Sequence, residues 1–300
     1  MRDNQPYPNG RAVEHAIKQA ANTKPDRVKS RALQAVTRDR FLCRVFTAAP
    51  DRWALKGGAG MLARIPQARN TLDIDLLSSE KSIDNAVAEL TRLAGIDLGD
   101  HFYFTAPRTE EISRGEEQAY VEGVRVEFDV RIGAKHHRHI AVDLVVGPNA
   151  TQPFETREPA SRLELPRLQT VPYRLYAVVD QIADKVCAAL EVHASGPSSR
   201  ERDLVDIALL ALTETIDAAD LRRALSSEFA RRSRRKPERF TTPASWGARY
   251  QKDAKDIGLL AGYPDVPAAR DLVATLIDPA LSQADLTGTW CPQRLRWLTA

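Results

Sequence analysis

One stretch, residues 53–77, constrains the fold of this chain more than any other. It begins with apolar residues 53–55, which predict a short strand, and continues into Lys56 and the pair Gly57-Gly58. Glycine has no Cβ atom, so the backbone can turn sharply at this pair and approach a ligand closely. Residues 61–65 then predict a short helix. Because the first amides of a helix are unpaired and carry partial positive charge, the turn is a candidate phosphate site.

A strand with two acidic residues ends this stretch. Residues 71–76 alternate between polar and apolar side chains, which is the period of a strand. The apolar positions, expected to face the core, are Leu72, Ile74 and Leu76. Asp73 and Asp75 then share the opposite face, and neighbouring carboxylates of this kind suit Mg²⁺ or Mn²⁺. A phosphate turn followed by a carboxylate pair predicts a site for a metal-bound nucleoside triphosphate (NTP).

The order of these motifs resembles a known enzyme superfamily. KGG, a helix and then R-x-T-x-D-I-D-L resemble the nucleotidyltransferase fold of the DNA polymerase β superfamily and, within it, the AbiEii/AbiGii toxin family with its MenT-like branch. The resemblance implies an α+β fold, with a polymerase-β-like sheet domain and a C-terminal helical domain. It also implies transfer of a nucleoside monophosphate from an NTP to an acceptor hydroxyl, with release of pyrophosphate.

The resemblance further implies a third metal-binding carboxylate on a neighbouring strand. Asp143 lies in the apolar strand predicted for residues 139–146, where an unpaired charge would be costly. Asp129, in the alternating strand of residues 124–132, is the competing candidate, and an exposed charge on an edge strand is the alternative without function. We favour Asp143. The expected metal ligands are therefore Asp73, Asp75 and Asp143.

Two helices predicted in the C-terminal half carry further candidates. In residues 172–193, Lys185 lies at the edge of an apolar stripe, so its stem could run along apolar surface toward a cleft. The resemblance implies that Lys185 is catalytic and that it contacts the triphosphate. The element R-D-x-x-D in the next helix also resembles the family. Asp203 suits a helix start by its charge alone, whereas Asp206 is expected to orient Lys185.

The expected nucleotide-binding set combines the turn, the loop before the acidic strand and the lysine helix. It consists of Lys56, Gly57, Gly58, Arg69, Thr71 and Lys185. The resemblance also makes Thr71 a position for regulation by phosphate modification. The expected catalytic set is Asp73, Asp75, Asp143, Lys185 and Asp206.

A proline-rich segment predicts where the sheet domain ends. Prolines at positions 153, 159 and 166 favour an extended connection, so we place the division near residue 165. Residues 1–165 then form the nucleotidyltransferase domain with its N-terminal helices, one of them long and spanning residues 23–46. Residues 166–300 form a helical domain that contributes Lys185 and Asp206.

Composition limits the partners. The net charge is only +3, so affinity for nucleic acid depends on local patches. The densest basic run, expected to hold an RNA backbone, contains Arg231, Arg232, Arg234, Arg235 and Lys236. No apolar run approaches the ~20 residues of a membrane span, and the N-terminus has no apolar signal segment, so we expect a cytoplasmic protein without membrane contact. Three dispersed cysteines favour reduced thiols.

The resemblance implies that the protein is the toxin of a toxin–antitoxin pair, which modifies the 3′ acceptor end of tRNA and is neutralised by a cognate antitoxin. Alternatives stay open. The same fold could act on a protein or a small molecule, and Asp-x-Asp also occurs in sugar-nucleotide glycosyltransferases, which lack the KGG turn. A non-catalytic module that binds RNA or a partner is a further possibility. His136, His137 and His139, at a predicted hairpin tip, would allow zinc but lack flanking ligands.

Overall fold

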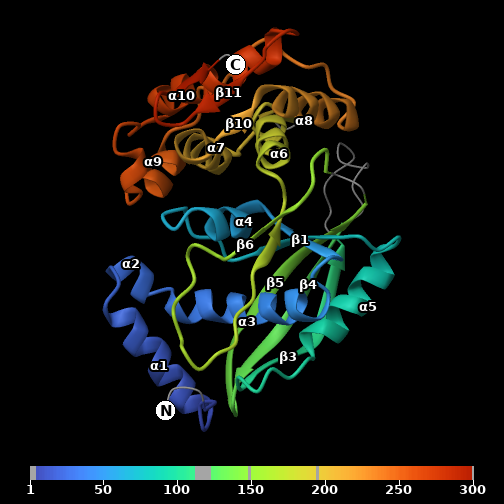
Figure 1. Cartoon of the computed structure of the whole chain (residues 1–300), viewed down its shortest axis with the longest axis vertical. Coiled ribbons are helices and arrows are strands. Elements are labelled where there is room, and N and C mark those ends of the chain that lie inside the picture. The colour runs from blue at the N-terminus through green and yellow to red at the C-terminus, as the bar shows by residue number, and fades with distance from the viewer. Residues whose placement is uncertain (1–4, 112–122, 148–149, 194–195, 299–300) are drawn as a thin grey trace.

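The computed structural model describes residues 5–111, 123–147, 150–193 and 196–298. A mixed sheet forms the first half of the chain and a helical layer follows it (Figure 1). The elements of the first half are α1 (Gly10–Asn22), α2 (Asp26–Lys29), α3 (Ala32–Ala48), β1 (Trp53–Lys56), α4 (Gly57–Arg64), β2 (Ile74–Ser78), α5 (Ile83–Ala94), β3 (Phe102–Glu111), β4 (Gly123–Ile132), β5 (Lys135–Val146), β6 (Glu155–Arg157) and β7 (Tyr173–Leu175).

The second half is mainly helical, and none of the described helices combines the length and apolar character needed to cross a bilayer. Its elements are α6 (Val178–Ala189), β8 (Val192–His193), β9 (Gly196–Pro197), α7 (Glu201–Thr213), β10 (Ile216–Asp217), α8 (Ala218–Arg231), α9 (Ala248–Ala254), the 3-10 helix η2 (Gly258–Leu260), α10 (Val266–Ser282), β11 (Thr289–Cys291) and β12 (Arg296–Leu298).

The sheet has the strand order β3-β4-β5-β2-β1-β7-β6, with β2 antiparallel to β1 and parallel to β5. Alternate residues of these central strands enter a core shared with α1, α3 and α5. They are Trp53, Leu55, Ile74, Leu76, Val142 and Leu144. Because side chains alternate between faces, Asp75 and Asp143 point to the other face of the sheet, away from these three helices.

The acidic strand is shorter than the sequence suggests. It begins at Ile74, where pairing with Val142 starts, so Asp73 directly precedes it. Leu72, which was expected in the core, is 52% exposed. It precedes the strand, and side chains alternate between the two faces of the sheet only within a paired strand. The expected helix of residues 61–65 begins earlier, at Gly57. The expected long helix of residues 23–46 is broken at Arg31, whose φ of −117° and ψ of 0° are not helical, into α2 and α3.

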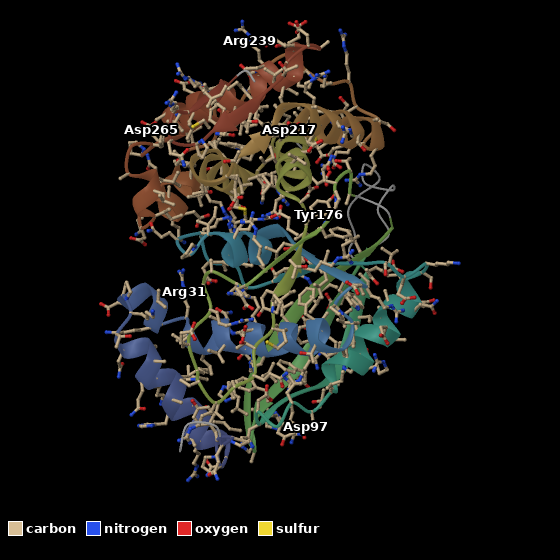
Figure 2. The ribbon with its side chains drawn as sticks, in the orientation of Figure 1. Arg31, Asp97, Tyr176, Asp217, Arg239 and Asp265 are labelled. Carbon is tan, nitrogen blue, oxygen red and sulfur yellow. The ribbon has the colours of Figure 1, made fainter. Side chains whose placement is uncertain are left out.

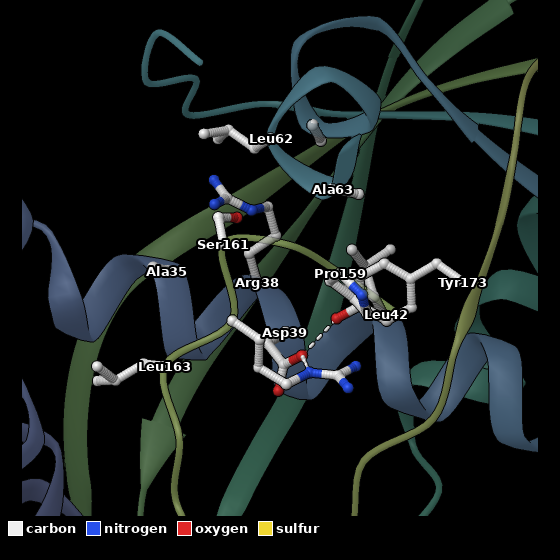
Figure 3. A pocket seen from close by; sticks show the side chains of 12 residues that line it. Ala35, Arg38, Asp39, Leu42, Leu62, Ala63, Pro159, Ser161, Leu163 and Tyr173 are labelled. Carbon is white, nitrogen blue, oxygen red and sulfur yellow. Dashed lines mark hydrogen bonds and ion pairs between the residues drawn. The ribbon is translucent and has the colours of Figure 1, made fainter. Parts of the chain in front are cut away.

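The proline-rich connection is anchored on α3 by a buried polar network. Asp39 accepts hydrogen bonds from Arg162 Nε, at 2.8 Å, and from the Tyr173 hydroxyl (Figure 3). The chain then returns to the sheet as β7, which pairs in parallel with β1. Local sequence could not show this pairing, because β7 has only three residues. The chain therefore leaves the sheet after Leu175 and not near residue 165. Helix α6 begins shortly afterwards, at Val178.

Helix α4 lies between the two halves of the molecule (Figure 1). Its residues Ala59 and Ala63 belong to the core of the sheet, whereas Met61 and Leu62 belong to the core of the helical half. Small side chains on one face allow close contact with the sheet, and the larger ones on the other join the core that contains residues of α6 and α7. The start of α4 is thereby fixed between the central strands and the helical layer.

Candidate active site

Three charged residues stand in a row across the centre of the sheet. In the strand register, Asp75 lies between Lys56 of β1 and Asp143 of β5. Burial raises the pKa of Asp75; Lys56 opposes this shift, and the nearby charge of Asp143 adds to it. The negative charge of Asp143 makes the ionised state of Asp75 less favourable, so the position favours a cation.

The glycine pair allows the backbone to lie directly against this row. Gly57 has a φ of +59°, and a Cβ atom placed there would come within 2.0 Å of Asp75 Oδ2. A Cβ atom on Gly58 would come within 2.9 Å of Thr71 Cβ. Gln181 Nε2 of α6 donates to the Gly57 carbonyl at 2.9 Å and holds the turn. No described side chain caps the start of α4, so its first amides can receive a phosphate.

Arg125 of β4 is a site residue that the sequence did not reveal. Its Nε and one NH₂ group donate to Asp143 at 2.7 Å and 3.0 Å, and the guanidinium lies 3.5 Å from Asp73. Burial raises the pKa of Asp73, and Arg125 opposes that shift. A lone arginine in an alternating strand has no local signal; only the pairing of Arg125 with Asp143 across β4 and β5 places it here.

The carboxylate oxygens of Asp73, Asp75 and Asp143 are suitable ligands for Mg²⁺ or Mn²⁺. Asp73 and Asp75 flank the first residue of β2, and Asp143 is the partner of Asp75 on β5. Within the described residues, however, no three acidic, histidine or cysteine side chains are already arranged to hold a metal ion. Arg125 lies among these carboxylates instead, and its guanidinium provides positive charge to Asp73 and Asp143. We expect a divalent cation to compete with Arg125 for Asp143.

The exchange between Arg125 and a metal predicts the effect of removing the guanidinium. The Arg125→Gln variant should bind Mn²⁺ about tenfold more tightly than the wild type, because a hydrogen-bonded ion pair no longer competes. Titration with Mn²⁺, followed by the loss of the free-ion electron paramagnetic resonance signal, measures this directly. Arg108→Gln is the matched control, since Arg108 pairs with the exposed Asp129 at 2.9 Å on the same region of the sheet. Equal Mn²⁺ affinities for wild type and Arg125→Gln would contradict the competition.

Lys185 is buried, with 4% of the residue exposed, and does not run along the surface as the sequence suggested. Its Nζ donates to Asp203 at 2.9 Å and to Asp206 at 2.6 Å. Burial would lower the pKa of Lys185, but the two carboxylates outweigh it and hold the pKa above its usual value. Asp203 was assigned only to the helix start from sequence; its carboxylate is in fact a direct partner of Lys185.

Two arginines complete this cluster. Arg69 donates to Asp206 at 2.7 Å, and Arg200 donates to Asp203 at 2.6 Å. With Lys185, three cations surround two carboxylates, so the cluster keeps an excess of positive charge. The pKa of Arg200 is raised first by Asp203 and also by Asp75, which links this cluster to the carboxylate row. Such an excess beside the glycine turn suits a triphosphate.

The same cluster predicts a pH dependence of stability. Burial alone would raise the pKa of Asp203, but Lys185 and Arg200 hold it below the ordinary value of 3.8. A carboxylate with a lowered folded-state pKa stabilises the protein above pH 3.8 and loses this contribution as the pH falls further. The destabilisation caused by Asp203→Asn, measured by urea unfolding, should therefore shrink as the pH falls below 3.8. Asp271→Asn, which removes an exposed partner of Arg270, should show little such change.

Other predicted residues lie elsewhere. Asp129 pairs with Arg108 on β3 and β4 and is not in register with Asp75, unlike Asp143. The histidines lie on β5, not in a hairpin tip; His137 contacts Glu14 at 3.0 Å and His139 contacts Glu127 at 3.6 Å. The described residues include no metal-binding group that uses them.

Part of the basic run faces inward. Arg232 is buried and contacts Asp184 at 2.7 Å and Glu228 at 2.6 Å, and Arg231 also pairs with Glu228. The local sequence cannot show this, because the acidic partners of Arg232 include Asp184 on another helix. Arg235 lies exposed after these residues.

Similar proteins are found among known families and solved structures. Residues 40–274 match the family described as "Nucleotidyl transferase AbiEii toxin, Type IV TA system". Among solved structures, the chain is similar to MenT4, a nucleotidyltransferase toxin from Mycobacterium tuberculosis H37Rv, with a TM-score of 0.58 and 20% identity over 94% of this chain and 92% of MenT4. It is also similar to JHP933 from Helicobacter pylori, with a TM-score of 0.45 and 16% identity over 83% and 93% of the two chains. No curated protein matches the sequence.

The similarity to MenT4 confirms the predicted fold class. The chain has a mixed sheet and a helical layer, and its α+β architecture matches the fold of this nucleotidyltransferase toxin.

Proposed function

Since the chain belongs to the AbiEii family of nucleotidyltransferase toxins of type IV toxin–antitoxin systems, we propose that it transfers a nucleoside monophosphate from an NTP to the 3′ acceptor end of tRNA and so blocks translation. The observation that carries the transferase assignment is the row formed by Asp75 and Asp143 beside the glycine turn. A carboxylate pair next to a phosphate site is what transfer of a phosphoryl-linked group requires.

In the proposed reaction, the acceptor hydroxyl attacks the α-phosphorus and the bond to the β-phosphate oxygen breaks, which releases pyrophosphate. Asp73, Asp75 and Asp143 would hold Mg²⁺ or Mn²⁺. A divalent cation bound there would lower the pKa of the acceptor hydroxyl and stabilise the leaving group. The amides at the start of α4 would bind the phosphates, and Thr71 stands against Gly58 where it can reach them.

The cationic cluster would bind the negative charge that develops on pyrophosphate. Lys185 is positioned for this by Asp203 and Asp206, so its ammonium loses no freedom when the triphosphate binds. Lys56, Arg69 and Arg200 supply further positive charge around the same position. We place the protein in the cytoplasm, where a cognate antitoxin would bind it and restrain its activity.

The test is to incubate the purified chain with total tRNA, Mg²⁺ and each labelled NTP in turn, with Asp75→Ala as the inactive control. Label on tRNA with the wild type alone supports the proposal and identifies the preferred nucleotide. Label on a protein or a small acceptor would keep the transferase and overturn the tRNA assignment. If no acceptor is labelled and no Mg²⁺-dependent NTP binding is found, the chain is a non-catalytic module of the same fold.

A further inference from the structure

A cleft of about 640 Å³ opens beside the carboxylate row, between the N-terminal helices and α9. Its volume falls in the range of ~300–1,000 Å³ that ligand sites occupy. Figure 1 shows α2 opposite α9 on this side of the molecule, and Figure 2 shows Arg31 on the side of the N-terminal helices that faces α9. Thr71, Leu72 and Asp73 line the inner part of the cleft, so it leads directly to the proposed catalytic site.

The cleft has an excess of positive charge. Among its described lining residues, seven are lysine or arginine and three are aspartate, so an anionic ligand is favoured. Lys24, Arg31 and Lys252 are exposed and come from both walls. In the part of the chain that the structure describes, none of these three has a carboxylate partner within 4.0 Å. Their charges are therefore available to a ligand, unlike that of Arg202, which pairs with Asp253 at 3.3 Å.

Arg69 joins the cleft to the cationic cluster. Its side chain is 10% exposed, lines the cleft and donates to Asp206. Its Nε atom is buried and has no hydrogen-bond partner among the described residues. A buried, unpartnered donor in a cleft wall is costly unless a ligand or water satisfies it. The inner end of the cleft thus holds a donor for an anionic group next to Asp73.

The cleft also contains apolar surface where a base or ribose can lie. Leu72 is 52% exposed between Thr71 and Asp73, and the half-buried Val28 also lines the cleft. Cations at the mouth and an apolar side chain beside the catalytic carboxylates match a polyanion with uncharged rings, which is a nucleic-acid strand. An acidic peptide would use the cations but need not carry a ring beside each negative charge, whereas every nucleotide joins a phosphate to a ribose and a base.

We infer that this cleft binds the single-stranded end of an acceptor nucleic acid, with its backbone phosphates on Lys24, Arg31 and Lys252. The inference rests on the proposed transferase function and defines where its acceptor lies. The terminal hydroxyl then enters beside Asp73, while the triphosphate occupies the other side of the row, at the glycine turn and Lys185. The basic run around Arg235 is not this site: Figure 2 shows Arg239, near its end, at the outer edge of the helical half, away from Arg31.

The experiment compares two triple variants that remove equal charge. One is Lys24→Ala, Arg31→Ala and Lys252→Ala in the cleft. The other is Arg235→Ala, Lys236→Ala and Arg239→Ala in the basic run. Binding of a fluorescent single-stranded RNA is measured by anisotropy between 50 and 200 mM salt. Binding of a fluorescent NTP with Mg²⁺ is measured in parallel, because it reports on folding and on the proposed transferase site independently of RNA.

The cleft variant should bind the RNA about tenfold more weakly at 50 mM salt, and the slope of log affinity against log salt should become shallower by about 2, as expected for three lost phosphate contacts. The variant of the basic run should bind like the wild type, and both should bind the NTP normally. RNA binding that depends on the basic run, or on neither set, would overturn the inference. So would a wild type that binds NTP but no RNA, with a protein as the labelled acceptor. If the wild type does not bind NTP, the result would instead count against the proposed transferase function itself.

Discussion

The Asp75→Asn variant is expected to lose nucleotidyl transfer by about 1,000-fold or more while it keeps its fold. Asparagine has the same shape but no negative charge, so the central position of the row between Lys56 and Asp143 would no longer attract a metal ion. Because burial raises the pKa of Asp75, its charge is costly in the free protein, and the neutral amide should if anything raise the thermal midpoint. Initial rates of label transfer and a thermal melt measure the two effects.

Asp129→Asn is the control for this prediction. It removes a carboxylate from the same sheet that pairs with Arg108 and lies out of register with the row. Its transfer rate should stay within about twofold of the wild type, since it lies at an exposed ion pair of small energetic weight. A large loss for Asp129→Asn, with Asp75→Asn still active, would mean that the metal site has been placed on the wrong strand.

The second large effect concerns stability. Asp206→Ala should lower the free energy of unfolding by about 3–5 kcal/mol, because it leaves two buried cations without their shared carboxylate. Asp206 is 0% exposed and accepts from Lys185 at 2.6 Å and from Arg69 at 2.7 Å. Urea unfolding, analysed at constant m-value, gives the change.

A double variant separates this explanation from simple loss of packing. Adding Lys185→Met to Asp206→Ala removes one of the two cations that lose this carboxylate, so the double variant should be more stable than Asp206→Ala alone. Transfer activity should not return, because the lysine proposed to contact the triphosphate is gone. If the losses of stability from the two substitutions simply add, the charges of Lys185 and Asp206 are not coupled, and the description of the cluster is wrong.

Local features of the site were predictable from sequence. Glycines mark a turn because only they tolerate the contact with Asp75 and Thr71, and alternation correctly placed Ile74 and Leu76 in the core. Lys185 was proposed as a site residue through a resemblance. Its burial was not, since its position at the edge of an apolar stripe is equally compatible with an exposed ammonium, and the contact with Asp203 spans 18 residues of sequence.

Features that depend on strand register or on distant contacts were missed. Arg125 reaches Asp143 only because β4 and β5 pair in a particular register. Leu72 was wrongly assigned to the core because the alternation of polar and apolar residues begins before the strand does, and no signal in the sequence marks where the strand starts. The cleft lies between α2 and α9, which are more than 200 residues apart. No local pattern of charge could reveal that Lys24 and Lys252 line the same surface.

The shared helix α4 restricts how relatives of this protein can recombine. Its two faces belong to two different cores, so the sheet half cannot be joined to the helical half of another relative unless the residues equivalent to Met61 and Leu62 fit the new partner. A mismatch there would displace the helix start and, with it, the glycine turn beside Asp75. Substitutions at exposed positions such as Lys24 and Lys252 leave this packing unchanged, whereas exchange of a whole half requires that the two sides of α4 match.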